Sequence, residues 1–312
     1  FDVNFEVDFN PNPSGVDTNT TSLADGSTDL DLFMDNLVED FDLNQNIKYV
    51  LSDNISLDGG WQIKKLSFDY RETFAGKEVT NIQSAPKIYS SFINITAKPF
   101  PILYINSGLR VSRYNRYDDI MLSPTLGIKY NPISNLAIKT SIGRYSQFLY
   151  TINQEEELLR IVDFWQPIPD GQKPQQADHL IIGTEYWMST GNTISLETYF
   201  KSYSSIYDLN PVPDYENIEQ TLAVSGTAKA FGIEFLYRFN KKKLNGWVSY
   251  AFSNIRRKVD LNSDLTLDSD KEIYPAKYDK PHSFNSLLSY QINERYSLGV
   301  STTIGSGQTY TP

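Results

Sequence analysis

The sequence predicts an all-β protein, specifically part of an antiparallel transmembrane β-barrel, because runs with a period of two alternate with short turns and long connections. The short turns are expected at 52–54, 98–101, 131–134, 189–192, 240–245 and 292–294. The long connections are expected at 10–44, 75–84, 150–176, 209–222 and 260–280, and only the connection at 115–118 departs from the alternation. Barrels of the bacterial outer membrane have short periplasmic turns and long extracellular loops. The pattern therefore indicates both a topology and a location in the bacterial outer membrane.

The composition agrees with this fold class. The 312 residues include 21 tyrosines and 17 phenylalanines, residues that suit strands and membrane interfaces. No segment approaches the ~18 consecutive apolar residues of a transmembrane helix. The mean hydropathy of −0.40 is compatible with a barrel, since only alternate residues of a barrel strand face lipid. The absence of cysteine excludes disulfides, and the net charge of −10 argues against nucleic acid as a partner.

About 13 candidate strands follow from the alternation, and most reach the ~9–11 residues that a tilted barrel strand needs to cross the hydrocarbon. The candidates are 1–9, 45–51, 55–74, 85–97, 102–114, 119–130, 135–149, 177–188, 193–208, 223–239, 246–259, 281–291 and 295–304. An odd number of strands does not close the usual even-numbered barrel, and open edges in lipid are costly. We therefore expect further strands outside this chain.

Several candidate strands separate an apolar face from a polar one. In 135–149, Leu136, Ile138 and Ile142 alternate with polar residues, and 193–208 and 223–239 show the same division. Charged residues in the middle of a polar face favour a wet lumen over a dry core. They are expected either to line a water channel or to hydrogen-bond to a plug inside the barrel. The candidate lumen residues are Lys139, Gln147, Glu197, Lys201, Glu234 and Arg238.

The long acidic connection 10–44 contains the one helix that the sequence suggests. Its segment 32–38, Leu-Phe-Met-Asp-Asn-Leu-Val, is expected to form a short helix within an otherwise irregular loop.

Motifs of enzymes are absent. The chain has no P-loop, no G-x-S-x-G and no H-E-x-x-H, and its two histidines, His179 and His282, each precede a predicted strand. The favoured interpretation places both histidines at the barrel rim as polar residues, with a catalytic or metal-binding role as the alternative. We expect no enzymatic activity and no cofactor.

Two acidic clusters raise the question of calcium. Asp25, Asp29 and Asp31 lie close together, as do Asp264, Asp268 and Asp270. Neither cluster has the ligand spacing of an EF-hand. Solvated exterior loops are the favoured interpretation, and calcium binding is the alternative.

The connection 150–176 is the strongest candidate for ligand recognition. It combines aromatic, amide and carboxylate side chains, and such groups on a barrel rim can either bind a ligand or pack the loop against its neighbours. The same choice applies to the tyrosines that end the strand 193–208 and to the following loop. The candidate ligand-binding residues are Asp163, Trp165, Gln166, Tyr203, Tyr207 and Tyr215.

Four stretches resemble the barrel of TonB-dependent outer-membrane receptors. The first runs Leu-Ser-Pro-Thr-Leu-Gly-Ile-Lys-Tyr over 122–130 and continues to Gly-Arg-Tyr-Ser-Gln-Phe at 143–148. The others are 176–201, with Gly-Thr-Glu-Tyr at 183–186; 230–250, with Ala-Phe-Gly-Ile-Glu and Gly-Trp-Val-Ser-Tyr; and 278–307, with Tyr-Asp-Lys-Pro-His-Ser-Phe-Asn. The resemblance covers roughly residues 85–312, and the order and spacing of the motifs carry it.

The resemblance implies a 22-stranded barrel plugged by an N-terminal domain, with energy supplied through the TonB complex. It implies uptake of a scarce nutrient such as an iron–siderophore, a vitamin or a glycan. The chain begins within a strand and ends in a loop, so we expect a piece of one barrel domain, with the plug and the last strands outside it. Outer-membrane lipid and a surface lipoprotein are the further expected partners.

Other functions compete with active transport. A passive porin-type channel needs neither plug nor TonB. A soluble extracellular β-sandwich, such as a lectin or adhesin, would bury Phe231, Phe235 and Phe239 between two sheets. A hydrolase is more distant, since no motif positions a pair of carboxylates.

Overall fold

The computed structural model describes residues 2–12, 32–74, 76–152, 164–189, 191–209, 223–259, 273–276 and 278–307. Most of these residues lie in strands, and among them no helix is long and apolar enough to cross a membrane. The strands are β1 (Asp2–Asn12), β2 (Leu32–Ser52), β3 (Ile55–Phe74), β4 (Lys77–Ser84), β5 (Lys87–Phe100), β6 (Leu103–Tyr114), β7 (Ile120–Ile133), β8 (Leu136–Gln147), β9 (Leu149–Ile152), β10 (Phe164–Pro167), β11 (Gln175–Ser189), β12 (Asn192–Leu209), β13 (Ala223–Lys241), β14 (Leu244–Val259), β15 (Ile273–Pro275), β16 (His282–Gln291) and β17 (Ser297–Gly305).

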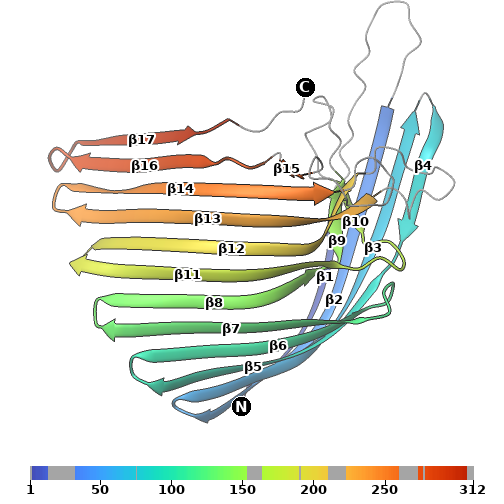
Figure 1. The fold of residues 1–312 in the computed structure, drawn as a ribbon, viewed down its shortest axis with the longest axis horizontal. Coiled ribbons are helices and arrows are strands. Elements are labelled where there is room, and N and C mark those ends of the chain that lie inside the picture. Colours follow the sequence, from blue (N-terminus) through green and yellow to red (C-terminus); the bar gives the residue numbers. More distant parts are fainter. Residues whose placement is uncertain are drawn as a thin grey trace, which may run out of the picture.

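One large antiparallel sheet contains almost all of these strands (Figure 1). Its order is β1-β2-β3-β5-β6-β7-β8-β11-β12-β13-β14-β16-β17, so neighbours in the sheet follow one another along the chain. β4 pairs with residues 68–74 of β3, and β15 pairs with β14. β9 and β10 form a separate antiparallel pair. This single curved sheet is the wall of a barrel, and it lacks the two packed layers that a sandwich requires.

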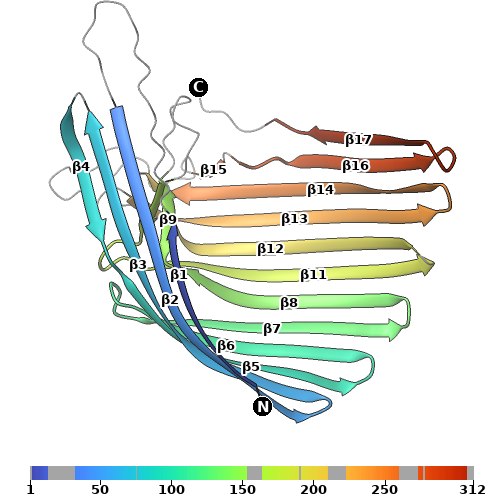
Figure 2. The same cartoon turned by 180° about the vertical axis from the view of Figure 1, so that it is seen from behind.

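The two ends of the strands differ as the sequence predicts. Tight turns join β2 to β3, β5 to β6, β7 to β8, β11 to β12, β13 to β14 and β16 to β17, all at one end (Figures 1 and 2). At that end Lys242 adopts a positive φ of 46°, and Gly191 one of 84°, as tight turns require. The long connections leave from the opposite end, which we call the loop end.

Two predicted connections are mostly strand where the structure describes them. In the connection predicted at 10–44, residues 32–44 belong to β2 and pair with β3, so the segment 32–38 is not helical. The predicted loop 75–84 is mostly β4. β4 and β5 pair with the same edge of β3, one after the other, and Pro86 lies in the short break between them. Proline cannot donate to a ladder, and here its carbonyl still accepts from the Leu66 amide at 3.0 Å. Tertiary pairing thus overrode local propensity in both places.

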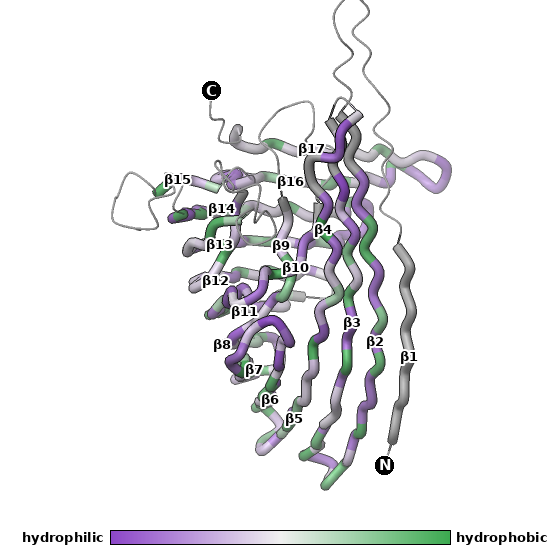
Figure 3. The backbone as a smooth tube through the Cα atoms, turned by 90° about the vertical axis from the view of Figure 1, so that its right-hand side faces the viewer, coloured by the Kyte–Doolittle hydropathy of each residue, from purple (hydrophilic) through white to green (hydrophobic). Residues whose placement is uncertain are grey.

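The register divides the side chains into two faces of opposite character. Directly opposed residues point to the same side of a sheet, so Leu196 and Phe235 share one face, and Glu197 and Glu234 share the other. The large exposed apolar side chains gather on the first face, and the hydropathy alternates along the strands accordingly (Figure 3). Among them are Ile47, Ile63, Ile93, Leu109, Leu126, Ile138, Ile142, Ile182, Leu196, Phe200, Phe231, Ile233, Phe235, Leu288 and Val300.

Curvature identifies the apolar face as the outer one. The hairpin β9–β10 lies between β3 and the later strands in Figure 3, and it packs on Leu66, Phe68 and Tyr70 of β3. These residues share a face with Lys64 and therefore with the polar side chains. The polar face is concave, and the apolar face is convex and exposed. An exposed apolar surface of this extent is typical of contact with lipid.

Gly232, on the concave face, leaves room for an aromatic ring. Any Cβ at Gly232 would overlap the ring of Tyr199, which lies across the backbone of β13. The Lys201 ammonium in turn stands 4.8 Å from the centroid of that ring. An aromatic ring over a glycine covers exposed backbone and fixes the pairing of two strands.

The assignment of the two faces can be tested by placing lysine at two adjacent residues that point to opposite faces. Ile233→Lys places a charge on the convex face and should destabilise the protein by about 2–4 kcal/mol if the residue lies near the bilayer midplane. Glu234→Lys places the same side chain on the concave face and should cost much less. Unfolding by urea in lipid vesicles would measure both. Equal destabilisation would contradict the assignment of the faces.

Candidate functional site at the loop end

The described parts of the connection between β8 and β11, residues 148–152 and 164–174, fold back into the concavity of the sheet. In the hairpin β9–β10, Trp165 pairs with Thr151 and Gln166 pairs with Tyr150. Residues 166–169, Gln-Pro-Ile-Pro, are all buried, and Ile168 has no exposed surface. A proline-rich segment with no solvent contact is unusual for a loop, since loops generally run over the surface. This loop forms part of a core.

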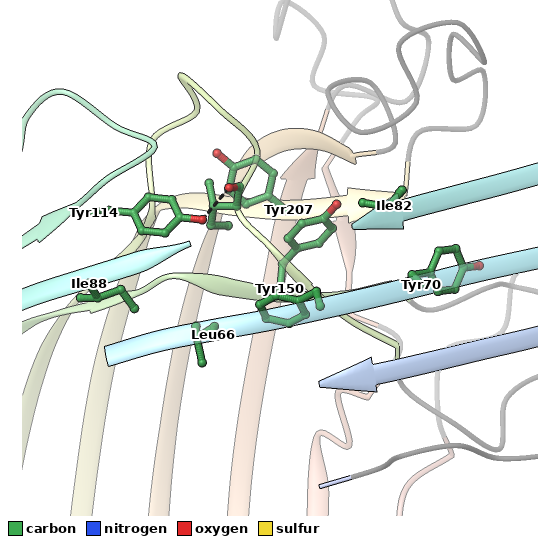
Figure 4. Close-up of a cluster of buried hydrophobic side chains, with 9 residues drawn as sticks. Leu66, Tyr70, Ile82, Ile88, Tyr114, Tyr150 and Tyr207 are labelled. Carbon is green, nitrogen blue, oxygen red and sulfur yellow. Dashed lines mark hydrogen bonds between the residues drawn. The ribbon is translucent and has the colours of Figure 1, made fainter. Parts of the chain in front are cut away.

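That core joins opposite walls of the sheet (Figure 4). Tyr150 of the loop packs with Tyr207 of β12 at a ring-centroid distance of 5.5 Å, while Phe148 contacts Tyr114 of β6 at 5.4 Å. Tyr114 is fully buried, and its hydroxyl donates to the Ile168 carbonyl at 2.8 Å. The buried members are Leu66, Phe68, Tyr70, Ile82, Ile88, Tyr114, Tyr150, Ile168 and Tyr207, which we call the mouth cluster.

Hydrogen bonds hold the loop on both sides of the mouth cluster. The Tyr207 hydroxyl donates to the Lys173 carbonyl at 2.7 Å, and the Ser205 hydroxyl donates to the same oxygen at 3.2 Å. Burial raises the pKa of Tyr207 to about 12, so its hydroxyl stays protonated and able to donate at any physiological pH. On the other side, the Arg116 guanidinium lies 2.9 Å from the Asp170 carboxylate, tying the loop to the β6–β7 connection.

A second loop segment is fastened to the end of β14. Asp279 is buried and accepts from the Ser253 hydroxyl at 2.8 Å and from the Ile255 amide at 3.0 Å. Upstream of Asp279, the Tyr274 hydroxyl of β15 donates to Asp208 at 2.9 Å, and Arg257 pairs with the same carboxylate at 3.1 Å. Both loop segments therefore narrow the mouth of the concavity.

The predicted ligand-binding residues have different environments. Trp165 is 40% exposed on β10, whereas Gln166 is only 2% exposed, and its buried Nε2 has no hydrogen-bond partner among the residues that the structure describes. Tyr207 belongs to the mouth cluster. Tyr203 lies lower on β12 beside His179, with a ring-centroid distance of 6.2 Å. Asp163 and Tyr215 lie outside the described residues, as do the six aspartates considered for calcium.

The histidines lie in two different aromatic settings. The His179 ring is on the concave face of β11, 4.8 Å from the ring of Tyr145, and no described residue forms a hydrogen bond with its buried Nε2. His282 begins β16, and its Nδ1 lies 2.8 Å from the Tyr250 hydroxyl. Over the described ranges, no three His, Asp or Glu side chains are grouped so that they could hold a metal ion.

The predicted lumen residues lie on the concave face of β8, β12 and β13. Lys139 pairs with Glu185 at 2.7 Å, and Gln147 donates to the Leu149 carbonyl at 3.0 Å. Two adjoining cavities lie over these strands: one of about 480 Å³ is lined by β12, β13 and β14, and one of about 160 Å³ is lined by β8, β11, β12 and β13. Glu197 and Arg238 line both cavities, and Glu234 lines the larger one. The arrangement presents charge of both signs to whatever fills the concavity.

A further polar network on the concave face was not predicted from the sequence. Lys64 of β3 lies 2.7 Å from Asp40 and 3.3 Å from Asp42 of β2. Gln62 bridges Asp42 to Arg110 of β6 by hydrogen bonds. The period-two spacing of Asp40 and Asp42 was the available signal, but it lay in the segment expected to be a loop.

Comparison with protein families gives a match along the entire chain. The family described as "TonB dependent receptor-like, beta-barrel" matches residues 1–312. None of the curated proteins matches the chain.

Solved structures give the same fold. The FrpB iron transporter from Neisseria meningitidis (F3-3 variant) superimposes with a TM-score of 0.61 at 13% identity, over 85% of this chain and 42% of that one. The siderophore receptor PirA from Pseudomonas aeruginosa gives 0.58 at 14% identity, over 88% of this chain and 47% of that one. The alcaligin outer-membrane receptor FauA from Bordetella pertussis gives 0.57 at 12% identity, over 88% and 47%. The chain thus spans less than half the length of these neighbours.

The packing of the mouth cluster can be tested at its buried hydrogen bond. Tyr114→Phe in the full-length receptor removes the donor to the Ile168 carbonyl and should weaken loop packing by about 0.5–1.5 kcal/mol. The Ile168 amide, which donates to Phe148 at 3.0 Å, should then exchange its hydrogen several-fold faster. Tyr117→Phe is the matched control in the neighbouring connection, because its hydroxyl bonds only to exposed Asp119. Unchanged exchange in Tyr114→Phe would refute the role of this bond.

Proposed function

The chain belongs to the TonB-dependent receptor β-barrel family, and on this premise we propose that it is part of an outer-membrane receptor that actively imports a scarce nutrient. An iron–siderophore is our first choice of substrate, with a vitamin or a glycan as the alternatives. The inward-folded β8–β11 loop carries the proposal, because it presents an exposed aromatic residue above a polar concavity. The structural neighbours named as an iron transporter, a siderophore receptor and the receptor for alcaligin favour the choice of an iron–siderophore.

The ligand would first meet the loop end. Trp165 is the exposed anchor there, and Tyr203 offers a second aromatic surface deeper on β12. Tyr207 and Gln166 act in this proposal through packing, because both are buried within the folded loop. Asp163 and Tyr215 remain candidates for direct contact.

The concave face would hold the plug domain of the parent receptor. Lys139, Glu197, Glu234 and Arg238 present charge of both signs, and the Asp40–Asp42–Lys64 network does so on the opposite wall. Gln147 and Lys201 lie on the same face nearer the loop end. Charged hydrogen bonds of this kind give specific but breakable contacts, which suits a plug that must rearrange when TonB pulls on it. A surface lipoprotein over the mouth is a further possible partner of the same receptor.

Energy coupling separates this function from passive diffusion. Cells that express the full-length receptor should accumulate radioactive iron supplied as ferric siderophore, and deletion of TonB should abolish the accumulation. A porin would continue to admit the label without TonB. Labelled vitamin and oligosaccharide, tested in the same strains, would identify the alternatives. Accumulation that does not depend on TonB for any substrate would overturn the proposal.

The exposed aromatic residue of the loop gives a site-level prediction. Trp165→Ala should weaken substrate binding by about 10-fold or more, since a buried aromatic contact at an interface is commonly worth over 1 kcal/mol. The thermal stability of the receptor should change little, because Trp165 lies outside the mouth cluster. Tyr296→Ala serves as the control, since Tyr296 is an exposed aromatic residue at the short-turn end. Titration calorimetry would measure affinity, and unchanged affinity in Trp165→Ala would remove the residue from the site.

A further inference from the structure

Three basic side chains stand together on the convex face near the loop end. Lys65 of β3 is directly opposite Lys87 of β5, and Arg113 of β6 is opposite Tyr89, one row nearer the bilayer. All three are exposed, and their side chains form no ion pair or hydrogen bond with any described residue. Like charges directly opposite on a sheet repel each other and are destabilising unless an anion lies between them.

Carboxylates do not neutralise this cluster. Glu39 of β2 is a diagonal neighbour of Lys65 but makes no ion pair with it. Asp69, four residues beyond Lys65, accepts a hydrogen bond from Gln83 at 3.2 Å. By contrast, Arg144, on the convex face of β8, is neutralised by a two-pronged contact with Asp178 at 2.6 and 2.9 Å. The three basic residues therefore present a net positive charge on a chain whose overall charge is −10.

An apolar groove runs along the convex face next to these charges. It has a volume of about 370 Å³, and Arg113 lies at its loop-end margin. Ser91 is small and lies between Trp61 and Val111 in the same row of the sheet, which leaves the groove open. The outward-facing residues that line it are Trp61, Ile63, Tyr89, Ser91, Val111, Arg113 and Ile120.

We propose that Lys65, Lys87 and Arg113, with the groove beside them, form a binding site for a phosphate-bearing lipid of the outer leaflet. The three cations would contact the phosphate head, and one acyl chain would lie along Ile63, Val111 and Trp61. Anionic headgroups are attracted to basic residues at the membrane surface, and a chain in the groove adds apolar contact. This site rests on the proposed membrane location of the chain, and it is separate from the nutrient path on the concave face.

The test measures lipid binding to the full-length receptor in detergent by native mass spectrometry. The probes are a diphosphorylated lipid A, the same lipid without phosphates, and inorganic phosphate. Lys65→Gln/Lys87→Gln/Arg113→Gln should bind the diphosphorylated lipid about 10- to 100-fold more weakly than the native protein, since each basic residue contributes. The native protein should also prefer this lipid to its dephosphorylated form, and inorganic phosphate should not displace it.

Two further variants distinguish the contribution of the three basic residues to lipid binding from that of the apolar groove. Lys241→Gln/Lys242→Gln/Lys243→Gln removes the same charge from the turn between β13 and β14, at the opposite end of the strands, and should leave lipid binding unchanged. Ser91→Phe fills the groove while keeping all three cations, and should weaken lipid binding several-fold. Equal binding by the native protein and the first triple variant would overturn the site. Displacement of the lipid by inorganic phosphate would overturn the role of the groove.

Nutrient uptake distinguishes the two proposals. The first triple variant should retain TonB-dependent uptake if lipid binding and transport are separate. A native receptor that binds the lipid but accumulates no nutrient would defeat the proposed transport function and leave the lipid site standing.

Discussion

Backbone hydrogen bonding is the constraint on which the structure depends. In hydrocarbon no water is present to satisfy an N–H or C=O group, so a membrane-crossing sheet must pair each strand with its neighbours without interruption. Pairing without interruption fixes the register, and the register then assigns every side chain to the lipid or to the interior. A slip of one residue between β12 and β13 would exchange Glu197 with Leu196, and it would place a carboxylate in lipid.

The loop end is free of that constraint and shows different chemistry. Towards the loop end the ladder of β12 and β13 shifts register between Tyr203 and Ile206, and β12 then carries Tyr207 into the mouth cluster. Bulges commonly re-aim a strand at a functional end of a barrel. Because of this change of register, β12 belongs to the regular wall before Tyr203 and packs against the folded loop after Ile206.

The sequence predicted strands correctly where the alternation of apolar and polar residues arises only from the two faces of the sheet. Strands such as β8, β12 and β13 were predictable because different surroundings on the two faces of a sheet impose alternation, and the residues of their concave face followed from the same pattern. Residues 32–38 and β4 were missed, since their state is decided by pairing with β3 across many residues. The burial of Gln166 was equally out of reach, because it depends on a loop that packs against walls distant in sequence.

The mouth cluster combines favourable aromatic packing with the unfavourable burial of a polar group. Its tyrosines and Ile168 pack residues 148–152 and 164–169 of the β8–β11 loop into the concavity, yet the same packing buries the Gln166 amide, whose donor is unpaired within the described part of the chain. An unpaired buried donor costs about 1–3 kcal/mol, which offsets part of what the aromatic contacts contribute. Because Trp165 is part of the same hairpin, any ligand that contacts its ring acts directly on that balance.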